Sequence, residues 1–209
     1  YIEEVANAVS LQNINLESGT VVAKGLIRAA TSLDPIACNA IISRAIKQRG
    51  VIKTWNEVIS PVLVAVGEKW ATTNRGIEVE HLLSDQIVLA FMQYANSLSE
   101  PINARPVLLA TAPDDLHSLP LYAVAAALAE KKIRCQSLGG ETPAEVIAEV
   151  FKKVAPPAIF IWAQIPENVD GDFVEKLPVL RPAPRIVLAG PGWLEIGRAS
   201  CRERVSSPV

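Results

Sequence analysis

The sequence predicts a four-helix bundle followed by a Rossmann-like α/β domain with a parallel sheet, and three observations support this fold class. Residues 21–100 contain amphipathic segments in which apolar residues recur at three- and four-residue steps. After the bundle, apolar runs of strand length alternate with helical patterns, which is typical of a parallel sheet covered on both faces. The segment SEPINARP at 99–106 carries two prolines and marks the boundary between these patterns.

The first half is predicted to form four helices with short connections, which favour antiparallel neighbours. The helical segments are 20–33, 33–50, 54–71 and 76–99. In the second segment Asp34 is the expected N-cap, Pro35 takes the first helical position and Gly50 ends the helix. Ile36 is expected in its buried apolar stripe. Pro61 is expected to kink the third helix or to mark its first stable turn.

The second half is predicted to alternate strands with helices. The strand segments are 106–113, 133–140, 158–164 and 185–190, and the helical segments are 121–132, 143–154 and a shortened 172–177. Four regions are therefore expected: a linker or N-terminal extension at 1–20, the bundle at 21–100, the α/β domain at 101–194 and a non-native tail at 195–209. The last segment, EIGRASCRERVSSPV, has no periodicity and resembles a translated sequencing adapter, so we expect the α/β domain to be truncated C-terminally.

Composition narrows the possible functions. The formal net charge of −2 and the pI near 5.8 argue against nucleic-acid binding by this segment itself. Cys38, Cys135 and Cys201 are odd in number and widely spaced, which predicts free thiols in a reducing cytoplasm. No apolar run approaches the roughly 20 residues that a membrane span needs. No nucleophile with a paired base is evident, so we do not expect an enzyme that uses its own side chains for catalysis.

Asp115 and His117 are the first candidate functional residues. They follow the first predicted strand, and in an open parallel sheet ligands bind beyond the carboxyl ends of the strands. Because they are two positions apart, a turn lets the carboxylate accept a hydrogen bond from one ring nitrogen, which leaves the other nitrogen oriented to ligate a metal. Ser118 is expected to cap the next helix, with Pro120 in its first turn. The alternative is a polar turn that only caps a helix.

The order of these parts resembles the cobalamin-binding modules. These include the corrinoid domains of methionine synthase and of methyl-carrier proteins, and the sensory half of certain MerR-type transcription regulators. The family motif is Asp-x-His-x-x-Gly, matched here by Asp115 and His117, with Pro120 in place of the glycine. The resemblance implies that His117 replaces the cofactor's own base as the lower axial ligand of cobalt.

The resemblance also points to four residues beside the nucleotide tail of the cofactor. Where the family has serine near the third strand, this chain has Trp162, which adds bulk and removes a hydroxyl. The family's Gly-Gly pair, which lets the tail approach the backbone, corresponds to Ala189 and Gly190, with Gly192 close behind.

The bundle carries a second part of the resemblance. Trp70 and the pair Glu80 and His81 have the spacing of cobalamin-dependent photoreceptor regulators that repress carotenoid genes. There these residues cap the upper face of adenosylcobalamin, where an indole packs on the adenosyl group and polar side chains bond its hydroxyls. The light-sensing members have a histidine after the tryptophan, whereas this chain has Ala71, which cannot ligate cobalt. The alternative places Trp70 in the bundle core and the Glu-His pair on a solvated helix edge.

Three functions remain open from the sequence. The first is a cytoplasmic sensory module of a cobalamin-dependent regulator, in which cobalamin, most readily its adenosyl form, is the cofactor. Its ligand or light state would control oligomerisation and DNA binding. Homo-oligomers are expected, no membrane is involved, and DNA is contacted only through a winged-helix domain upstream of this chain. The second is a corrinoid methyl carrier of a methyltransferase system. The third is a cofactor-free interaction module, favoured by Pro120 and Trp162.

Overall fold

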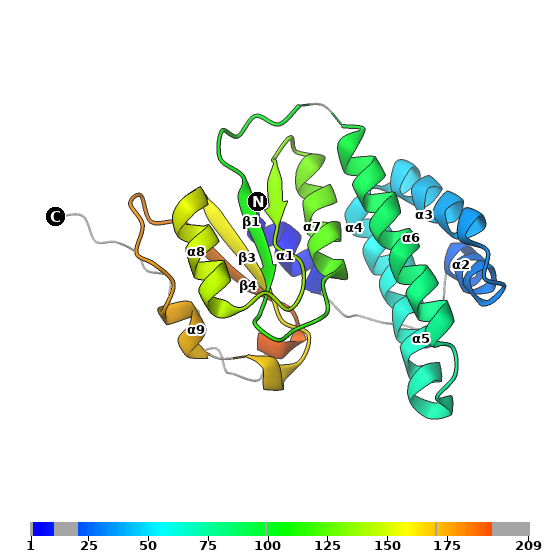
Figure 1. Cartoon of the computed structure of the whole chain (residues 1–209). Helices are drawn as coiled ribbons and strands as arrows, with labels where there is room; N and C mark the ends of the chain where they lie inside the picture. Colours follow the sequence, from blue (N-terminus) through cyan, green and yellow to red (C-terminus); the bar gives the residue numbers. More distant parts are fainter. Residues whose placement is uncertain (1, 11–20, 99, 170, 194–209) are drawn as a thin grey trace.

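The computed structural model describes residues 2–10, 21–98, 100–169 and 171–193 (Figure 1). The predicted tail at 195–209 lies outside the described residues, as does most of the predicted linker at 1–20. Within that linker, residues 2–10 form the helix α1, Ile2–Ser10. No helix among the described residues has the length and apolar character needed to cross a membrane.

The predicted four-helix bundle is present. It consists of α2 (Val21–Thr31), α3 (Pro35–Arg49), a long third helix and α6 (Ile77–Asn96). The predicted ends of α3 are confirmed, since Asp34 Oδ1 accepts a hydrogen bond from the Ala37 N–H at 2.9 Å and Gly50 follows the last turn with φ of 79°. The prediction for Ile36 is wrong: this side chain is 82% exposed, because the stripe that α3 turns inward is formed by Cys38, Ile42, Ala45 and Ile46.

The third helix contains the break that Pro61 predicts. It comprises α4 (Val51–Thr54), a π-helical turn (Trp55–Ile59) and α5 (Ser60–Thr73), in that order. Pro61 lies in the first turn of α5, directly after the π-helical turn, and without an N–H it cannot donate the helical hydrogen bond of its position. The Ser60 N–H bonds the Trp55 carbonyl five residues back, so the wider turn absorbs the change in hydrogen bonding.

The second half is a four-stranded parallel sheet with the strand order β2-β1-β3-β4. The strands are β1 (Val107–Thr111), β2 (Cys135–Ser137), β3 (Ala158–Trp162) and β4 (Arg185–Ala189). The helices between them are α7 (Leu119–Ala129), α8 (Ala144–Val154) and α9 (Gly171–Glu175), with short 3-10 turns at Pro166–Asn168 and Pro191–Trp193. The predicted fold class, a helical bundle followed by a Rossmann-like domain, is confirmed.

The molecule is layered. In Figure 1 helices α8 and α9 cover one face of the sheet, while α7 and α1 cover the other, and the bundle stacks on that second layer. Val5, Ala6 and Val9 bury the inner side of α1 against α7 and β4, and their spacing is that of one face of an amphipathic helix. One apolar cluster therefore runs from the sheet into the bundle, and a smaller one fills the space under α8 and α9.

Candidate functional site

Asp115 is the buried residue on which the hydrogen bonds of the candidate site converge. It lies in the loop after β1, at the carboxyl edge of the sheet, and its side chain is fully buried. Its Oδ1 accepts hydrogen bonds from the His117 N–H and the His117 ring, both at 2.8 Å. Its Oδ2 accepts from the backbone N–H groups of Gln164 and Ile165, at 2.6 and 3.3 Å. One carboxylate therefore ties the loop after β1 to the loop after β3.

The hydrogen bonds keep this buried carboxylate ionised. Burial by itself raises the pKa of Asp115, but the bonds from the His117 ring, the His117 N–H and the Gln164 N–H outweigh it, so the pKa lies below its ordinary value. An ionised carboxylate can only accept hydrogen bonds. The proton in the 2.8 Å contact must therefore lie on Nδ1 of His117.

This contact fixes the tautomer of His117. With the proton on Nδ1, the neutral imidazole carries its free electron pair on Nε2. The His117 side chain is 47% exposed, so Nε2 is available to a ligand at the edge of the sheet. A histidine held by a carboxylate through one nitrogen, with the other nitrogen open, is the usual arrangement of a histidine metal ligand. The predicted Asp115–His117 hydrogen bond is thus present. Among the described residues no group of three or more His, Cys, Asp or Glu could hold a metal ion by itself.

The bundle places its candidate residues near the connection between α5 and α6. Trp70 lies in the last turn of α5 and is 44% exposed, so it does not belong to the bundle core. Glu80 and His81 lie in the first turns of α6 with their side chains 41% and 71% exposed, and 3.7 Å separates Glu80 Oε2 from His81 Nε2. Glu80 Oε1 also accepts a hydrogen bond from Ser84 at 2.9 Å.

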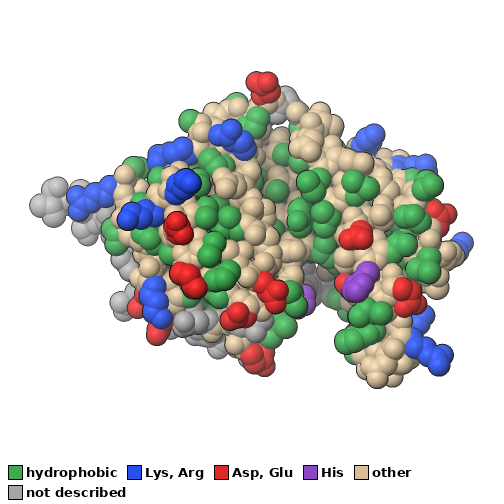
Figure 2. All heavy atoms as spheres, in the orientation of Figure 1, with side chains coloured by type: hydrophobic (Ala, Val, Ile, Leu, Met, Phe, Trp, Pro, Cys, Tyr) green, Lys and Arg blue, Asp and Glu red, His purple; other side chains and the backbone are tan. Residues whose placement is uncertain are grey.

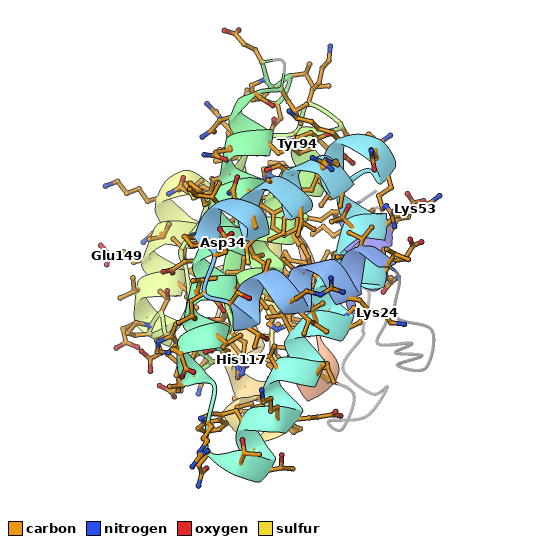
Figure 3. The ribbon with its side chains drawn as sticks, turned by 90° about the vertical axis from the view of Figure 1, so that its right-hand side faces the viewer. Lys24, Asp34, Lys53, Tyr94, His117 and Glu149 are labelled. Atoms are coloured by element: carbon orange, nitrogen blue, oxygen red, sulfur yellow. The ribbon has the colours of Figure 1, made fainter. Side chains whose placement is uncertain are left out.

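Figure 2 shows a notch at the lower edge of the molecule, between the α/β half and the lower ends of α5 and α6. The chain has two histidines, and the purple spheres lie on opposite sides of this notch. Figure 3, which faces the bundle side, labels His117 in the lower part of the molecule. The notch therefore has one histidine on each side, His117 of the α/β half and His81 of α6.

Trp162, Gly190 and Gly192 lie at the carboxyl ends of β3 and β4. Trp162 is 2% exposed and packs in the cluster shared with the bundle. Gly190 has φ of 105°, and a Cβ on it would lie 2.2 Å from the Ala163 carbonyl oxygen. A Cβ on Gly192 would lie 3.0 Å from the same oxygen. Gly190 is required here by its positive φ and by the close approach of the loop after β4 to the loop after β3, and at Gly192 the space for a side chain is tight.

The structure also shows what sequence reasoning missed. The backbone amides of Gln164 and Ile165 hold Asp115, and a backbone donor has no side-chain signature beyond its position after a strand. Ser118 occupies the N-cap position of α7, but its side chain makes no capping bond, so the predicted role is wrong. Its backbone is in the α region, where the hydroxyl is not directed at the first N–H groups of the helix. Pro120 does lie in the first turn, as predicted.

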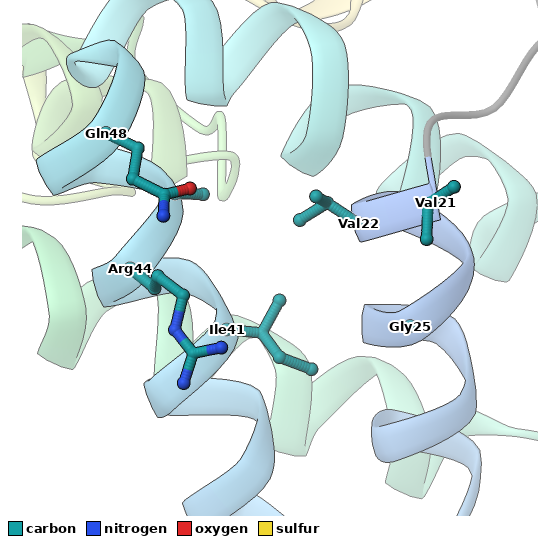
Figure 4. A pocket seen from close by; sticks show the side chains of 7 residues that line it. Val21, Val22, Gly25, Ile41, Arg44 and Gln48 are labelled. Carbon is teal, nitrogen blue, oxygen red and sulfur yellow. The ribbon is translucent and has the colours of Figure 1, made fainter.

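Two hollows lie on the surface of the described residues, one beside the candidate site and one away from it. One of about 200 Å³ lies between α2 and α3, where Val22, Gly25, Ile41 and Arg44 are among its lining residues (Figure 4). The other, of about 470 Å³, lies beside the loop after β1 and is lined by Pro113, Asp114, Pro143, Ala144, Glu145, Glu167, Val169 and Phe173. The second hollow adjoins the candidate site, whereas the first belongs to the far side of the bundle.

Comparison with known proteins gives a matching family and several relatives. Residues 22–91 match the family model described as "B12 binding domain". Over 181 residues the chain is 24% identical to the HTH-type transcriptional repressor CarH of Myxococcus xanthus. The aligned region covers 86% of this chain and 58% of the repressor. The chain thus spans a little over half the length of the curated relative that it matches.

One of the solved structures that this chain resembles shares its fold. The monomethylamine corrinoid protein of Methanosarcina barkeri superposes with a TM-score of 0.53 at 14% identity, over 84% of this chain and 88% of that chain. A cobalamin-binding protein from Desulfitobacterium hafniense DCB-2 gives a TM-score of 0.35 at 18% identity, over 79% and 82% of the two chains. The family model and the repressor confirm the predicted resemblance to cobalamin-binding regulators, and the corrinoid protein confirms the predicted fold class.

Proposed function

We propose that this chain is a cobalamin-binding sensory module in which His117 is the lower axial ligand of cobalt. The observation that supports this most directly is the hydrogen bond of 2.8 Å from the His117 ring to the buried Asp115 carboxylate. It sets the tautomer that leaves Nε2 able to donate its electron pair to a metal. Bound cobalamin would supply the cobalt centre and its cleavable bond to an upper axial group.

The residues present fit the metal-facing side of such a cofactor. A single neutral imidazole is a suitable axial donor because the corrin ring supplies the other nitrogen ligands. Asp115 is anchored by two backbone amides of another loop, so the imidazole keeps its orientation before a ligand arrives. His117 therefore needs little reorganisation on binding.

The partly exposed side chains across the notch fit the upper face. We propose that Trp70 packs on an upper adenosyl group and that Glu80 and His81 bond its hydroxyls, which makes adenosylcobalamin the preferred form. Ala71 offers no nitrogen to cobalt, so loss of the adenosyl group in light would leave no second histidine ligand from that position.

As a regulator, the module would act through assembly rather than catalysis. A ligand shifts a conformational equilibrium only by binding one state more tightly than another. Cofactor in the notch would touch both the bundle and the α/β half, and so would favour one packing of the two. We propose that this changes homo-oligomerisation in the cytoplasm, and that a winged-helix domain outside this chain contacts DNA.

Dark titration with adenosylcobalamin tests the assignment of His117. We expect the wild type to retain the cofactor through gel filtration, with the absorption spectrum of a cobalt ligated from below by imidazole. His117→Ala should lose that spectral signature and bind at least ~10-fold more weakly, since removing the ligand costs no less than removing its supporting carboxylate.

His81→Ala is the matched control, because His81 is the other histidine of the chain and lies on the opposite side of the notch. This variant should keep the spectrum of lower imidazole ligation while its affinity falls. A His117→Ala protein with the wild-type spectrum would contradict the assignment.

The assembly state separates a regulator from a methyl carrier, whose fold this chain shares. We expect the gel-filtration volume of the wild type to differ between the cofactor-free and the cofactor-bound protein, and to change again after illumination. A methyl carrier predicts one elution volume in all three samples. An unchanged volume with cofactor bound would therefore favour the carrier.

A further inference from the structure

The space beneath a cofactor ligated by His117 determines which corrinoid the chain can recognise. Cobalamin carries its own base on a nucleotide tail that contains a phosphodiester. If an imidazole of the protein takes the lower position, that base is displaced and the tail must lie somewhere below the corrin ring. This inference rests on the proposed function, because it assumes that His117 ligates cobalt.

On the bundle-facing side of the sheet this space is filled by protein. Trp162 is 2% exposed, and its neighbours in register are Thr111 on β1 and Ala189 on β4. A Cβ on Gly190 would lie 3.0 Å from Cδ2 of the Trp162 ring, so the loop after β4 rests directly on the indole. The side chain thus closes the ends of β1, β3 and β4.

The indole acts here by its volume. Nε1 of Trp162 has no hydrogen-bond partner among the described residues, and the buried hydroxyl of Thr111 beside it has none either. Two polar atoms without partners cannot be the reason for this packing, because each is unfavourable when buried. What Trp162 provides is a closed surface under the strand ends.

On the other side of the loop after β1 there is a hollow, but its lining carries the same negative charge as a phosphodiester. The hollow of about 470 Å³ is lined by three acidic residues, Asp114, Glu145 and Glu167, and no basic residue is among its described lining residues. A phosphodiester placed there would meet carboxylates of the same sign. Neither side of the loop therefore offers a binding site for the tail.

We infer that this chain does not bind the nucleotide tail of its cofactor: it recognises the corrin ring and its axial groups, and Trp162 excludes the tail. A corrinoid without the tail, of the cobinamide class, then binds at least as tightly as complete cobalamin. Trp162 is the residue that sets this specificity.

The test compares dissociation constants for adenosylcobinamide and adenosylcobalamin, measured in the dark by spectral titration. For the wild type we expect the cobinamide to have the equal or lower dissociation constant. In Trp162→Ser, which opens the closed space, the ratio of the two constants should shift at least ~10-fold toward adenosylcobalamin, since a fitting group of this size gains more than one tenfold step by burial.

The shift between proteins is the decisive quantity. Displacing the cofactor's own base from cobalt costs the same free energy with either protein, so that cost cancels when the ratios of the wild type and the variant are compared.

Trp193→Ser is the matched control, since Trp193 lies near the same edge but packs in the cluster under α8 and α9. It should leave the ratio unchanged. Trp162→Phe, a milder truncation, should shift the ratio in the same direction by less, and it replaces the serine variant if that fails to fold.

Each outcome decides the inference. A wild type that binds adenosylcobalamin more tightly than adenosylcobinamide would overturn it and leave the proposed function intact. The same holds if folded Trp162 variants keep the wild-type ratio. Binding of neither corrinoid would overturn the proposed function, and the inference with it.

Discussion

Asp115 has two roles in the candidate site: it joins two loops and it sets the tautomer of His117. It is completely buried, and four N–H groups from three residues converge on its two oxygens. A buried carboxylate is unfavourable unless such bonds compensate the loss of water. Here they do so, and the same bonds set the tautomer of His117. The residue therefore links the stability of two loops to the chemistry of the site.

Asp115→Asn tests this link. The amide keeps the shape but replaces one acceptor oxygen with an NH₂ group, which faces an N–H donor whichever way the side chain turns. We expect the free energy of unfolding at neutral pH to fall by ~2–3 kcal/mol, the range for hydrogen bonds to a charged group. Urea unfolding of the two proteins measures the difference, with Glu149→Gln at an exposed position as the control that should change little.

The pH dependence has a defined sign. Because the pKa of Asp115 is lowered on folding, the ionised carboxylate stabilises the fold above the ordinary aspartate pKa. This contribution is lost as the pH falls through the folded-state pKa. The gap in stability between wild type and Asp115→Asn should therefore narrow on acidification. A gap that stays constant into strongly acidic solution would show that the charge of Asp115 is not what stabilises the loops.

At the scale of elements, the sequence predicts best what is decided locally. The N-cap at Asp34, the end at Gly50 and the break at Pro61 depend on a few neighbouring residues, and all three are where the sequence places them. The same holds for the Asp115–His117 contact, which needs only a turn of two residues. The strands β1 and β3 are buried along their whole length, so their nearly continuous apolar character identifies them.

What depends on packing between distant segments is not predictable in this way. The exposure of Ile36 follows from the rotation of α3 against its neighbours. Trp162 belongs to a strand that is apolar on both faces, so no alternation tells which layer its indole enters. The donors to Asp115 Oδ2 come from residues 49 and 50 positions away, and they are backbone groups.

For the whole molecule, the two halves share one core rather than meeting at a thin interface. Helix α6 of the bundle packs along α7 of the α/β half, as Figure 1 shows. At one end of this contact Glu130 Oε1, just after α7, accepts hydrogen bonds from the Val51 N–H at 3.1 Å and the Tyr94 hydroxyl at 3.2 Å. Burial, and then the Glu130 carboxylate, raise the pKa of Tyr94. A single carboxylate thus joins α7 to two helices of the bundle.

The hydrogen bonds of Glu130 allow the contact between α7 and the bundle to be tested without a cofactor in the notch. Glu130→Ala leaves the Val51 N–H and the Tyr94 hydroxyl without their acceptor, so we expect the free energy of unfolding to fall by ~1–3 kcal/mol. Tyr94→Phe removes one of the two partners and should cost less. Both variants remove the same hydrogen bond between Glu130 and Tyr94. The double variant should therefore lose less unfolding free energy than the sum of the losses in the two single variants.

Denaturant unfolding of the two single variants and the double variant measures this coupling, with the exposed Glu149→Ala on α8 as the control that should change little. If the halves act as one unit, the transition should also remain a single step in the variants. Strictly additive losses would show that Glu130 does not join the bundle to α7 through Tyr94. Two separate transitions in the wild type would show that the halves unfold independently, and cofactor in the notch could then order one half without altering the other.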